Sequence, residues 1–393
     1  MAGSTSEQRW LRRVLHNETV GGAFMLGAAA LALVLANSPA ATTYHSITER
    51  HLNLPGGLNL SVAQWAADFL LALFFLVAGA ELKHELTTGS LASARRAVVP
   101  VCGALFGMAT SIPVFVLTAN GLSAGPAATR GWAVPSSTDI AFALAVLAIG
   151  GRRMHPAVRV LLLSIAVVND LGSILIIAVA FSQQVQLLAL AGAAGCVALW
   201  GFAQRRGVRN PIVYIPLFLI GWWAMQTSGV HATVVGMAFG LVCSTRRNSG
   251  GESGADAVDR VLRSWVAGLA VPIFALTAAG VSLASESGGI HPLTLAVLAG
   301  LVVGQPVGVY TGMRIAVRLL GGTVADGLRQ RDLLCVGCLA GVGFTVALLV
   351  SELTFSNRDL LEQAKLGVVS ASVVAGLLSL LAMRIAQPAR SPG

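Results

Sequence analysis

The stretch of sequence that decides the fold runs from Trp132 to Gly172 and reads WAVPSSTDIAFALAVLAIGGRRMHPAVRVLLLSIAVVNDLG. It contains two carboxylates, Asp139 and Asp170, and each interrupts an apolar run that is long enough to cross a bilayer. An ionisable group at membrane depth costs about 2.5–3.5 kcal/mol or more, and it is usually kept only for a function. The stretch therefore predicts two membrane spans that carry carboxylates into the bilayer.

The rest of the chain has the composition of an integral membrane protein. Of its 393 residues, 55% are hydrophobic and only 11% are charged, whereas a soluble domain has about 25% charged residues. The apolar runs are continuous rather than alternating, which favours helices over a β-barrel. We therefore predict an all-α polytopic protein of about twelve spans, at residues 15–36, 62–84, 97–118, 132–150, 157–181, 185–203, 211–225, 229–244, 262–283, 292–313, 333–355 and 364–386.

The basic residues give this arrangement an orientation. Twelve spans place both termini on one side, and 22 of the 26 Lys and Arg residues fall on that side; the other four are Arg50, Arg130, Arg358 and Lys365. The positive-inside rule makes that side cytoplasmic. The sequence thus predicts a multi-pass membrane protein with both termini in the cytoplasm. The same bias accounts for the net charge of +9 without a nucleic-acid partner.

The N-terminus resembles a secretory signal, because basic residues precede an apolar stretch. That stretch, from Val20 to Ala36, exceeds the usual apolar region of a signal peptide, which has about 7–15 residues. We therefore expect an uncleaved first span.

Spans 4 and 11 are interrupted. Pro135 and the hydroxyl run Ser136–Thr138 stand just before Asp139, and span 11 carries Gly341 and Gly343. Breaks at corresponding places in the two halves of a membrane chain are the best sequence indication of discontinuous helices. Such helices expose backbone groups at membrane depth, where protein or water must satisfy them.

These breaks indicate internal symmetry within a single transporter domain, residues 1–393. Spans 3–5 and 10–12 each have an interrupted middle helix, so we expect inverted repeats at 97–181 and 292–386. Two connecting segments also have a clear pattern. Residues 45–61 contain alternating apolar and polar residues around a Pro-Gly-Gly turn, which predicts an outer β-hairpin rather than an unstructured loop. Residues 245–257 are polar and rich in Gly and Ser, which predicts a flexible cytoplasmic loop.

The two carboxylates suit a cation or a proton. Asp170 lies about 14 residues beyond Pro156, roughly 21 Å along a helix and thus near the middle of the bilayer. Desolvation favours the protonated form of a carboxyl group, and a proton and a hard monovalent cation compete for the same oxygens. Thr138 and the carbonyls freed by the break can complete a shell for Na⁺ or Li⁺. Asp139 has an alternative role, which is to cap the second half-helix of its span.

Other polar residues have simpler explanations beside functional ones. Glu81 and Glu85 share one helix face at the cytoplasmic mouth, although an ordinary solvated helix end has the same pattern. His231 either tunes a pH response or packs as a hydrogen-bonded residue. Asp68, near the outer start of span 2, is expected to meet water. Cys335 and Cys338, inside an apolar helix, are expected to be small buried hydrophobes rather than a metal or redox site.

Taken together, these motifs resemble the NhaA family of Na⁺/H⁺ antiporters. The resemblance runs from Gly21 to the last span, so it covers nearly the whole chain. The motifs that carry it are GGAFMLGAAALALVLANS, ELKHELTTGSLAS, WAVPSSTDIAFALAVLA, NDLG, GVHATVVG, SWVAGLAVPIFALTAAGVSL, GQPVGV and GVGFTVAL.

The resemblance implies a role for several residues. Asp170 resembles the essential aspartate that binds cation and proton, and Thr138 and Asp139 resemble the pair at the crossing of two discontinuous helices. The stretch Gly341–Thr345 resembles the break in the partner helix, and the outer hairpin resembles a dimerisation element, so we expect a homodimer. The resemblance also implies a location in the bacterial cytoplasmic (inner) membrane. Positions linked in the family to pH response and the cytoplasmic entrance match Glu81, Lys83, Glu85, His231 and Asp259.

Two departures from the family pattern concern the core. The family usually has two consecutive aspartates where this chain has Asn169 and Asp170, and a lysine where this chain has Gln305. Losing one partner of a buried ion pair costs about 3–5 kcal/mol, but here both are neutral and an Asn–Gln pair can still hydrogen-bond. With Asp170 alone titrating in the core, we expect exchange of one proton for one cation, which is electroneutral.

Other functions fit less well. An intramembrane aspartyl protease should show a G-x-G-D signature, which this sequence lacks, so we expect a transporter rather than an enzyme. No cofactor is expected, because Na⁺ or Li⁺ and H⁺ are the substrates. The alternatives that stay open are a transport-impaired or regulatory family member, an exchanger of another monovalent cation, and a transporter of some other solute.

Overall fold

The computed structural model describes residues 18–54, 58–151, 153–182, 184–208, 210–247, 251–282, 291–325 and 327–386. Most of these residues are helical. Eight helices are long and apolar enough to cross a membrane, or up to ten if each of two bent pairs forms one span. The predicted all-α polytopic class is therefore confirmed, whereas the count of twelve spans is not reached within these ranges.

The shortfall has a local cause. Each expected span overlaps a helix, but two of these helices are short: α11 (Pro211–Thr227) has 17 residues and α12 (Thr233–Leu241) has nine. Nine residues span about 14 Å, less than half of the hydrocarbon core of about 30 Å. Gly229 adopts a left-handed conformation with φ of 81°, so the helix expected at 229–244 begins only at Thr233.

The chain divides into two compact units, which are described separately. The first unit contains residues up to Gly89 and residues Ile174–Gly280. Its other α-helices and strands are α2 (Glu18–Ala36), α3 (Ala41–Thr48), β1 (His51–Leu54), β2 (Leu58–Ser61), α4 (Val62–Trp65), α5 (Leu71–Thr87), α10 (Leu187–Arg205), α13 (Gly254–Trp265) and α14 (Val271–Ala278). The π-helical segments Ala66–Leu70 and Val266–Ala270 directly precede α5 and α14.

The second unit contains residues Ser90–Ser173 and those from Val281 onward, so it holds nearly all of the two segments expected to be inverted repeats. Helix α9 begins in this unit and ends in the first. The elements are α6 (Ala94–Gly121), α7 (Pro126–Thr129), α8 (Ile140–Gly150), α9 (Ala157–Ala180), α15 (Pro292–Ala299), α16 (Gln305–Leu319), α17 (Gln330–Ala340), α18 (Phe344–Thr354) and α19 (Arg358–Ala386).

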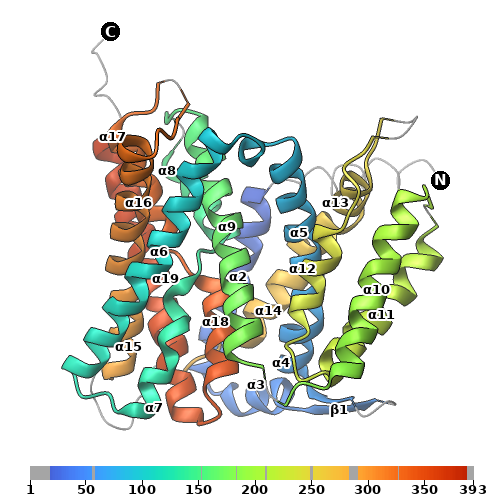
Figure 1. The fold of residues 1–393 in the computed structure, drawn as a ribbon. Helices are drawn as coiled ribbons and strands as arrows, with labels where there is room; N and C mark the ends of the chain where they lie inside the picture. Colours follow the sequence, from blue (N-terminus) through green and yellow to red (C-terminus); the bar gives the residue numbers. More distant parts are fainter. Residues whose placement is uncertain are drawn as a thin grey trace, which may run out of the picture. The chain divides into compact units, whose positions relative to one another are not determined.

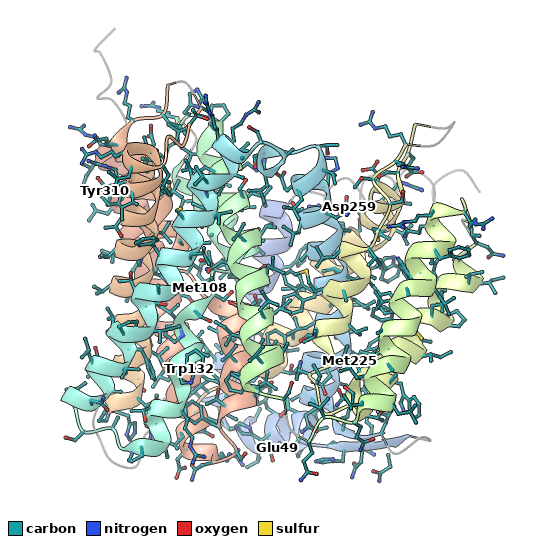
Figure 2. All side chains as sticks on the ribbon, viewed as in Figure 1. Glu49, Met108, Trp132, Met225, Asp259 and Tyr310 are labelled. Carbon is teal, nitrogen blue, oxygen red and sulfur yellow. The ribbon has the colours of Figure 1, made fainter. Side chains whose placement is uncertain are left out.

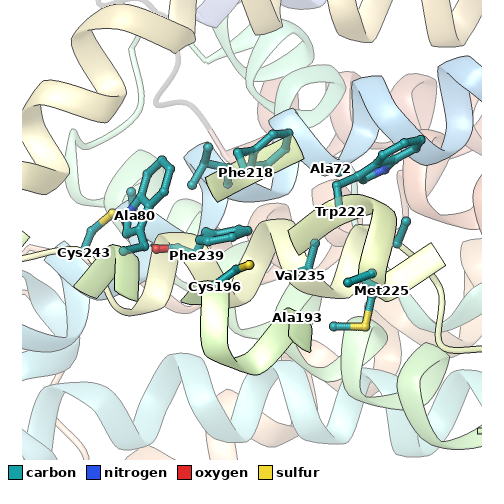
Figure 3. Close-up of a cluster of buried hydrophobic side chains, with 14 of the residues drawn as sticks. Ala72, Ala80, Ala193, Cys196, Phe218, Trp222, Met225, Val235, Phe239 and Cys243 are labelled. Atoms are coloured by element: carbon teal, nitrogen blue, oxygen red, sulfur yellow. Dashed lines mark hydrogen bonds between the residues drawn. The ribbon is translucent and has the colours of Figure 1, made fainter. Parts of the chain in front are cut away.

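Packing in the first unit depends on glycine and aromatic residues. A Cβ at Gly236 or Gly240 of α12 would collide with backbone carbonyl oxygens of Ala72 and Leu76 in α5, so the two helices can approach closely only without these side chains. The rings of Phe218 and Phe239 lie 5.7 Å apart between α11 and α12 (Figure 3). This packing holds the short α12 in place.

The predicted hairpin is confirmed where it is described. Strands β1 and β2 pair antiparallel from His51–Ser61 to Leu54–Leu58, and the turn at 55–57 lies outside the described residues. Helix α3 was not expected, and it covers the start of the segment 45–61. Helix α13 likewise begins inside the expected loop 245–257, because Ser253 and Asp256 form a reciprocal capping box; residues 248–250 lie outside the described ones.

The second unit contains both interrupted spans. The helical segment Pro126–Ser136, formed by α7 and the 3₁₀ segment Arg130–Ser136, meets α8 at a bend of 58°. Helix α17 is separated from α18 by the non-helical residues Gly341–Gly343. Helices α6 and α16 pack along one another although they are far apart in sequence (Figure 1). A π-helical turn at Gly300–Gly304, which the sequence analysis missed, directly precedes Gln305 at the start of α16.

Candidate functional site

The two helix breaks bind each other through their backbone. The Thr138 hydroxyl donates to the carbonyl oxygen of Ala340 at 2.7 Å, and the N–H of Asp139 donates to that of Val342 at 2.6 Å. In return, the N–H of Thr345 donates to Asp139 Oδ2 at 2.9 Å. The end of α17 and the beginning of α18 each leave backbone groups without helical partners, and the break after Pro135 supplies those partners. The predicted crossing of two discontinuous helices is therefore present.

Asp139 holds the N-termini of both second half-helices. Its side chain is 3% exposed, with Oδ1 accepting from the N–H of Phe142 at 2.9 Å and Oδ2 accepting from the N–H of Thr345. The first contact caps α8 and the second lies in the first turn of α18. Each helix N-terminus carries a partial positive charge, so one carboxylate compensates two of them. The capping alternative for Asp139 is confirmed.

The neutral residues Asn169 and Gln305 bind the first break rather than each other. Gln305 Nε2 donates to the carbonyl oxygen of Pro135 at 3.2 Å. The Asn169 amide satisfies its surroundings with its nitrogen 3.1 Å from the Ser136 carbonyl oxygen and its oxygen 3.1 Å from the Thr138 N–H. The Asn–Gln hydrogen bond that the two side chains would allow is therefore not formed. The break leaves two neighbouring carbonyl groups without helical partners, and each amide provides the N–H that one of them needs.

Gln305 is fully buried and keeps one polar atom unused. Its Oε1 has no hydrogen-bond partner among the described residues. The atom points at Gly107 of α6, where an added Cβ would collide with it. The glycine thus makes room for a side chain longer than the packing would otherwise allow.

Asp170 lies in α9 and faces the unwound segment. It is 2% exposed, and the hydroxyl of Ser137 donates to its Oδ1 at 3.2 Å. Thr138 was predicted to take part in the site and Ser137 was not, although all three residues after Pro135 carry a hydroxyl. No local signal separates these hydroxyls, because which of them faces Asp170 depends on the conformation of the break.

The atoms around the crossing that could bind a cation are oxygens. They come from the carboxylates of Asp139 and Asp170, the hydroxyls of Ser137 and Thr138, and the carbonyls of the broken segments. Among the residues that the structure describes, no three of the types His, Cys, Asp and Glu gather in a way that could hold a metal ion. An oxygen-only set suits a hard cation.

Comparison with known proteins identifies the family. The family model described as Na⁺/H⁺ antiporter 1 matches residues 12–383. The chain belongs to this family. Its similarity to curated members of the family is high: it is 43% identical to the Na(+)/H(+) antiporter NhaA of Streptomyces avermitilis, over 97% of this chain and 83% of that protein. It is 45% identical to Na(+)/H(+) antiporter NhaA 1 of Saccharopolyspora erythraea, over 93% of this chain and 89% of that protein.

One solved structure has a fold similar to that of this chain. The sodium proton antiporter MjNhaP1 of Methanocaldococcus jannaschii has a TM-score of 0.57 to this chain, with 95% of this chain and 97% of that chain covered. The two sequences are only 14% identical, so this similarity concerns the architecture alone.

In this member of the antiporter family, the residues expected at the entrance form two separate groups within the first unit. Arg263 bridges two carboxylates. Its Nη2 lies 3.5 Å from Glu81 Oε2, and its Nε lies 2.6 Å from Asp259 Oδ1. Asp259 lies on α13 (Figure 2). Glu85 is half-buried one turn beyond Glu81, near the end of α5. Arg263, which connects these carboxylates, was not predicted from the sequence.

His231 belongs to the other group. Its Nε2 lies 3.0 Å from Asp68 Oδ1, and its Nδ1 lies 2.7 Å from the Thr233 hydroxyl. Gln226 donates to Asp68 Oδ2 at 2.9 Å. Asp68 is 8% exposed, so the expectation that it meets water is wrong. Asp68 and Glu81 are 13 residues apart on a nearly continuous helix, which corresponds to about 20 Å. His231, which contacts Asp68, is therefore separate from the Glu81 group.

Proposed function

We propose that this protein exchanges Na⁺ or Li⁺ for H⁺ across the cytoplasmic membrane by alternating access, with cation and proton competing for Asp170. The observation that carries the proposal is the buried Asp170 carboxylate beside two crossed helix breaks, in a chain whose curated relatives are named Na⁺/H⁺ antiporters. A charged and empty carboxylate is costly at membrane depth, so alternating access is favourable only when Asp170 holds either a cation or a proton. That requirement couples the two movements.

The hydrogen bonds support a division of labour between the two aspartates. Both oxygens of Asp139 accept backbone N–H groups and thereby hold two half-helices. We propose that Asp139 organises the site and completes a shell around the cation together with Thr138, whereas Asp170 carries the cation or the proton.

We propose further that exchange is electroneutral. Asn169 and Gln305 bind backbone carbonyls and carry no charge, so neither of these two positions can bring another proton across. One proton then moves for each monovalent cation.

The placement in the membrane follows from the charges. We propose that the side with 22 of the 26 Lys and Arg residues is cytoplasmic and that both termini lie there. We also propose that two copies associate through the sheet of β1 and β2.

Reconstituted exchange tests the proposed function. In proteoliposomes with an imposed Na⁺ gradient, the wild-type protein should move protons in the opposite direction, and Asp170→Asn should abolish this flux while the protein remains folded. Asp359→Asn is the matched control, because Asp359 is an exposed residue of α19. Retained exchange by Asp170→Asn would refute the assigned carrier. A wild-type protein that moves K⁺ but not Na⁺ or Li⁺, or no cation at all, would support the alternatives of another monovalent cation or a regulatory role.

A further inference from the structure

The three hydroxyls that follow Pro135 have different partners. Ser136 donates to the carbonyl oxygen of Ala133 at 2.7 Å, and Thr138 donates to that of Ala340 at 2.7 Å. Both therefore satisfy backbone. Ser137 lies between them and donates to the carboxylate of Asp170 at 3.2 Å. Among these three hydroxyls, it is the one that contacts the proposed carrier.

The backbone of Ser137 is held firmly in place. The residue is fully buried and extended, with φ of −121° and ψ of 156°. A Cβ at Gly343 would lie 2.7 Å from the Ser137 carbonyl oxygen, so the second break packs directly against it. The Ser137 hydroxyl is thus presented to Asp170 by the crossing itself.

A hydroxyl can serve each state that Asp170 passes through. It has one hydrogen to donate and two lone pairs with which to accept. It donates to the empty carboxylate; after rotation about its C–O bond, its oxygen can accept the proton of a neutral carboxyl group or contact a bound cation. The other titratable group of the crossing, Asp139, already accepts two N–H groups, and Gln305, Asn169 and Thr345 are neutral.

From this geometry we infer that Ser137 is a positioning and specificity-determining residue of the exchange site, whose hydroxyl favours the cation over the proton on Asp170. This inference rests on the proposed function, because it assumes that Asp170 carries both. A donor to a carboxylate stabilises the charged form, and at 3.2 Å this bond is longer than a typical O–H···O bond, so its effect is modest. Removing the hydroxyl should therefore tighten proton binding, and because the proton competes with the cation for Asp170, the apparent affinity for the cation should fall wherever the two compete.

The test measures the apparent KM for Na⁺ and the maximal rate across a range of pH in proteoliposomes. Since the proton must leave Asp170 before Na⁺ binds, Ser137→Ala should move the pH of half-maximal exchange about one unit towards alkaline values. On the acidic side of that midpoint, the KM for Na⁺ should rise about tenfold. The maximal rate at alkaline pH should change by less than about twofold, because there the carboxylate is already charged.

Two further variants separate this role from packing. Ser137→Thr keeps the hydroxyl and should restore the wild-type midpoint. Ser372→Ala removes an equally buried hydroxyl, which donates to the Val368 carbonyl at 2.8 Å, and should change nothing. If Ser137→Ala is too unstable to transport, its melting temperature in detergent can be measured as a function of Na⁺ concentration at each pH. The concentration that gives half of the stabilisation then reports cation binding.

The outcomes are distinct. An unchanged midpoint in Ser137→Ala, or an equal shift in Ser137→Thr, would overturn the role of the hydroxyl while leaving the exchange function intact. If the wild-type protein showed no exchange, the proposed function itself would fail.

Discussion

At the scale of single residues, the partners of a carboxylate decide what it can do. Asp139 and Asp170 are both nearly inaccessible to solvent. The oxygens of Asp139 accept two backbone N–H groups, which fixes it in one arrangement, whereas Asp170 accepts from a hydroxyl that can rotate. A fixed network suits the scaffold of a site, and an adaptable one suits a group that must bind and release its ligand.

The role of Asp139 as a double cap can be tested by stability. Asp139→Ala would leave two buried N–H groups without partners, each at a cost of about 1–3 kcal/mol. The purified protein should therefore unfold at a clearly lower temperature than wild type. The control is Asp256→Ala, because Asp256 caps α13 alone through its bond with Ser253, and it should cause a smaller decrease. Equal stability of Asp139→Ala and the wild-type protein would contradict the double cap.

At the scale of elements, the short helix α12 depends on its glycines. Gly236→Ala would place a methyl group against the Ala72 carbonyl of α5, and since backbone cannot move aside as a side chain does, the two helices must separate. We expect a lower melting temperature and a reduced yield of monodisperse protein in detergent. Gly27→Ala in α2 is the matched control, because a Cβ there meets no described atom within 4 Å. It should be neutral or stabilise the protein by up to about 1 kcal/mol; equal losses in both variants would argue against close packing.

The sequence predicts elements well where the cause is local. Pro135 and the pair Gly341 and Gly343 restrict or free the backbone at their own positions, so both breaks were found. The length of α12 was missed because it depends on the conformation of Gly229 and on contacts with α5. The π-helical turn before Gln305 has no local signature either, since it arises from packing.

The same limit applies to the site. Asp139, Asp170 and Thr138 could be identified from their residue type and from the family resemblance. The hydrogen-bond partners of the two amides could not, because the chemistry of Asn169 and Gln305 equally allows them to bind each other. Only the three-dimensional position of the unwound carbonyls at Pro135 and Ser136 decides which partner each amide takes.

At the scale of the whole molecule, the absence of charge on Asn169 and Gln305 determines how exchange responds to a membrane potential. Moving one elementary charge through 100 mV is worth about 2.3 kcal/mol, or roughly a fiftyfold change in the Na⁺ gradient that an exchanger can sustain. An exchanger of two protons per Na⁺ would show that change. One-for-one exchange moves no net charge, so its Na⁺ gradient should not depend on the potential.

Proteoliposomes clamped with K⁺ and valinomycin make the measurement. With a pH gradient and no potential, the protein should accumulate Na⁺; with a potential and no pH gradient, it should not. The double variant Asn169→Asp with Gln305→Lys supplies the comparison, because it introduces an opposite pair of charges, whereas Gln305→Lys alone would leave a buried charge uncompensated at about 3–5 kcal/mol. If the lysine of the double variant exchanges its proton during transport, Na⁺ movement becomes sensitive to the potential. Potential-driven Na⁺ movement by the wild-type protein would show instead that a group other than these two brings the additional charge across.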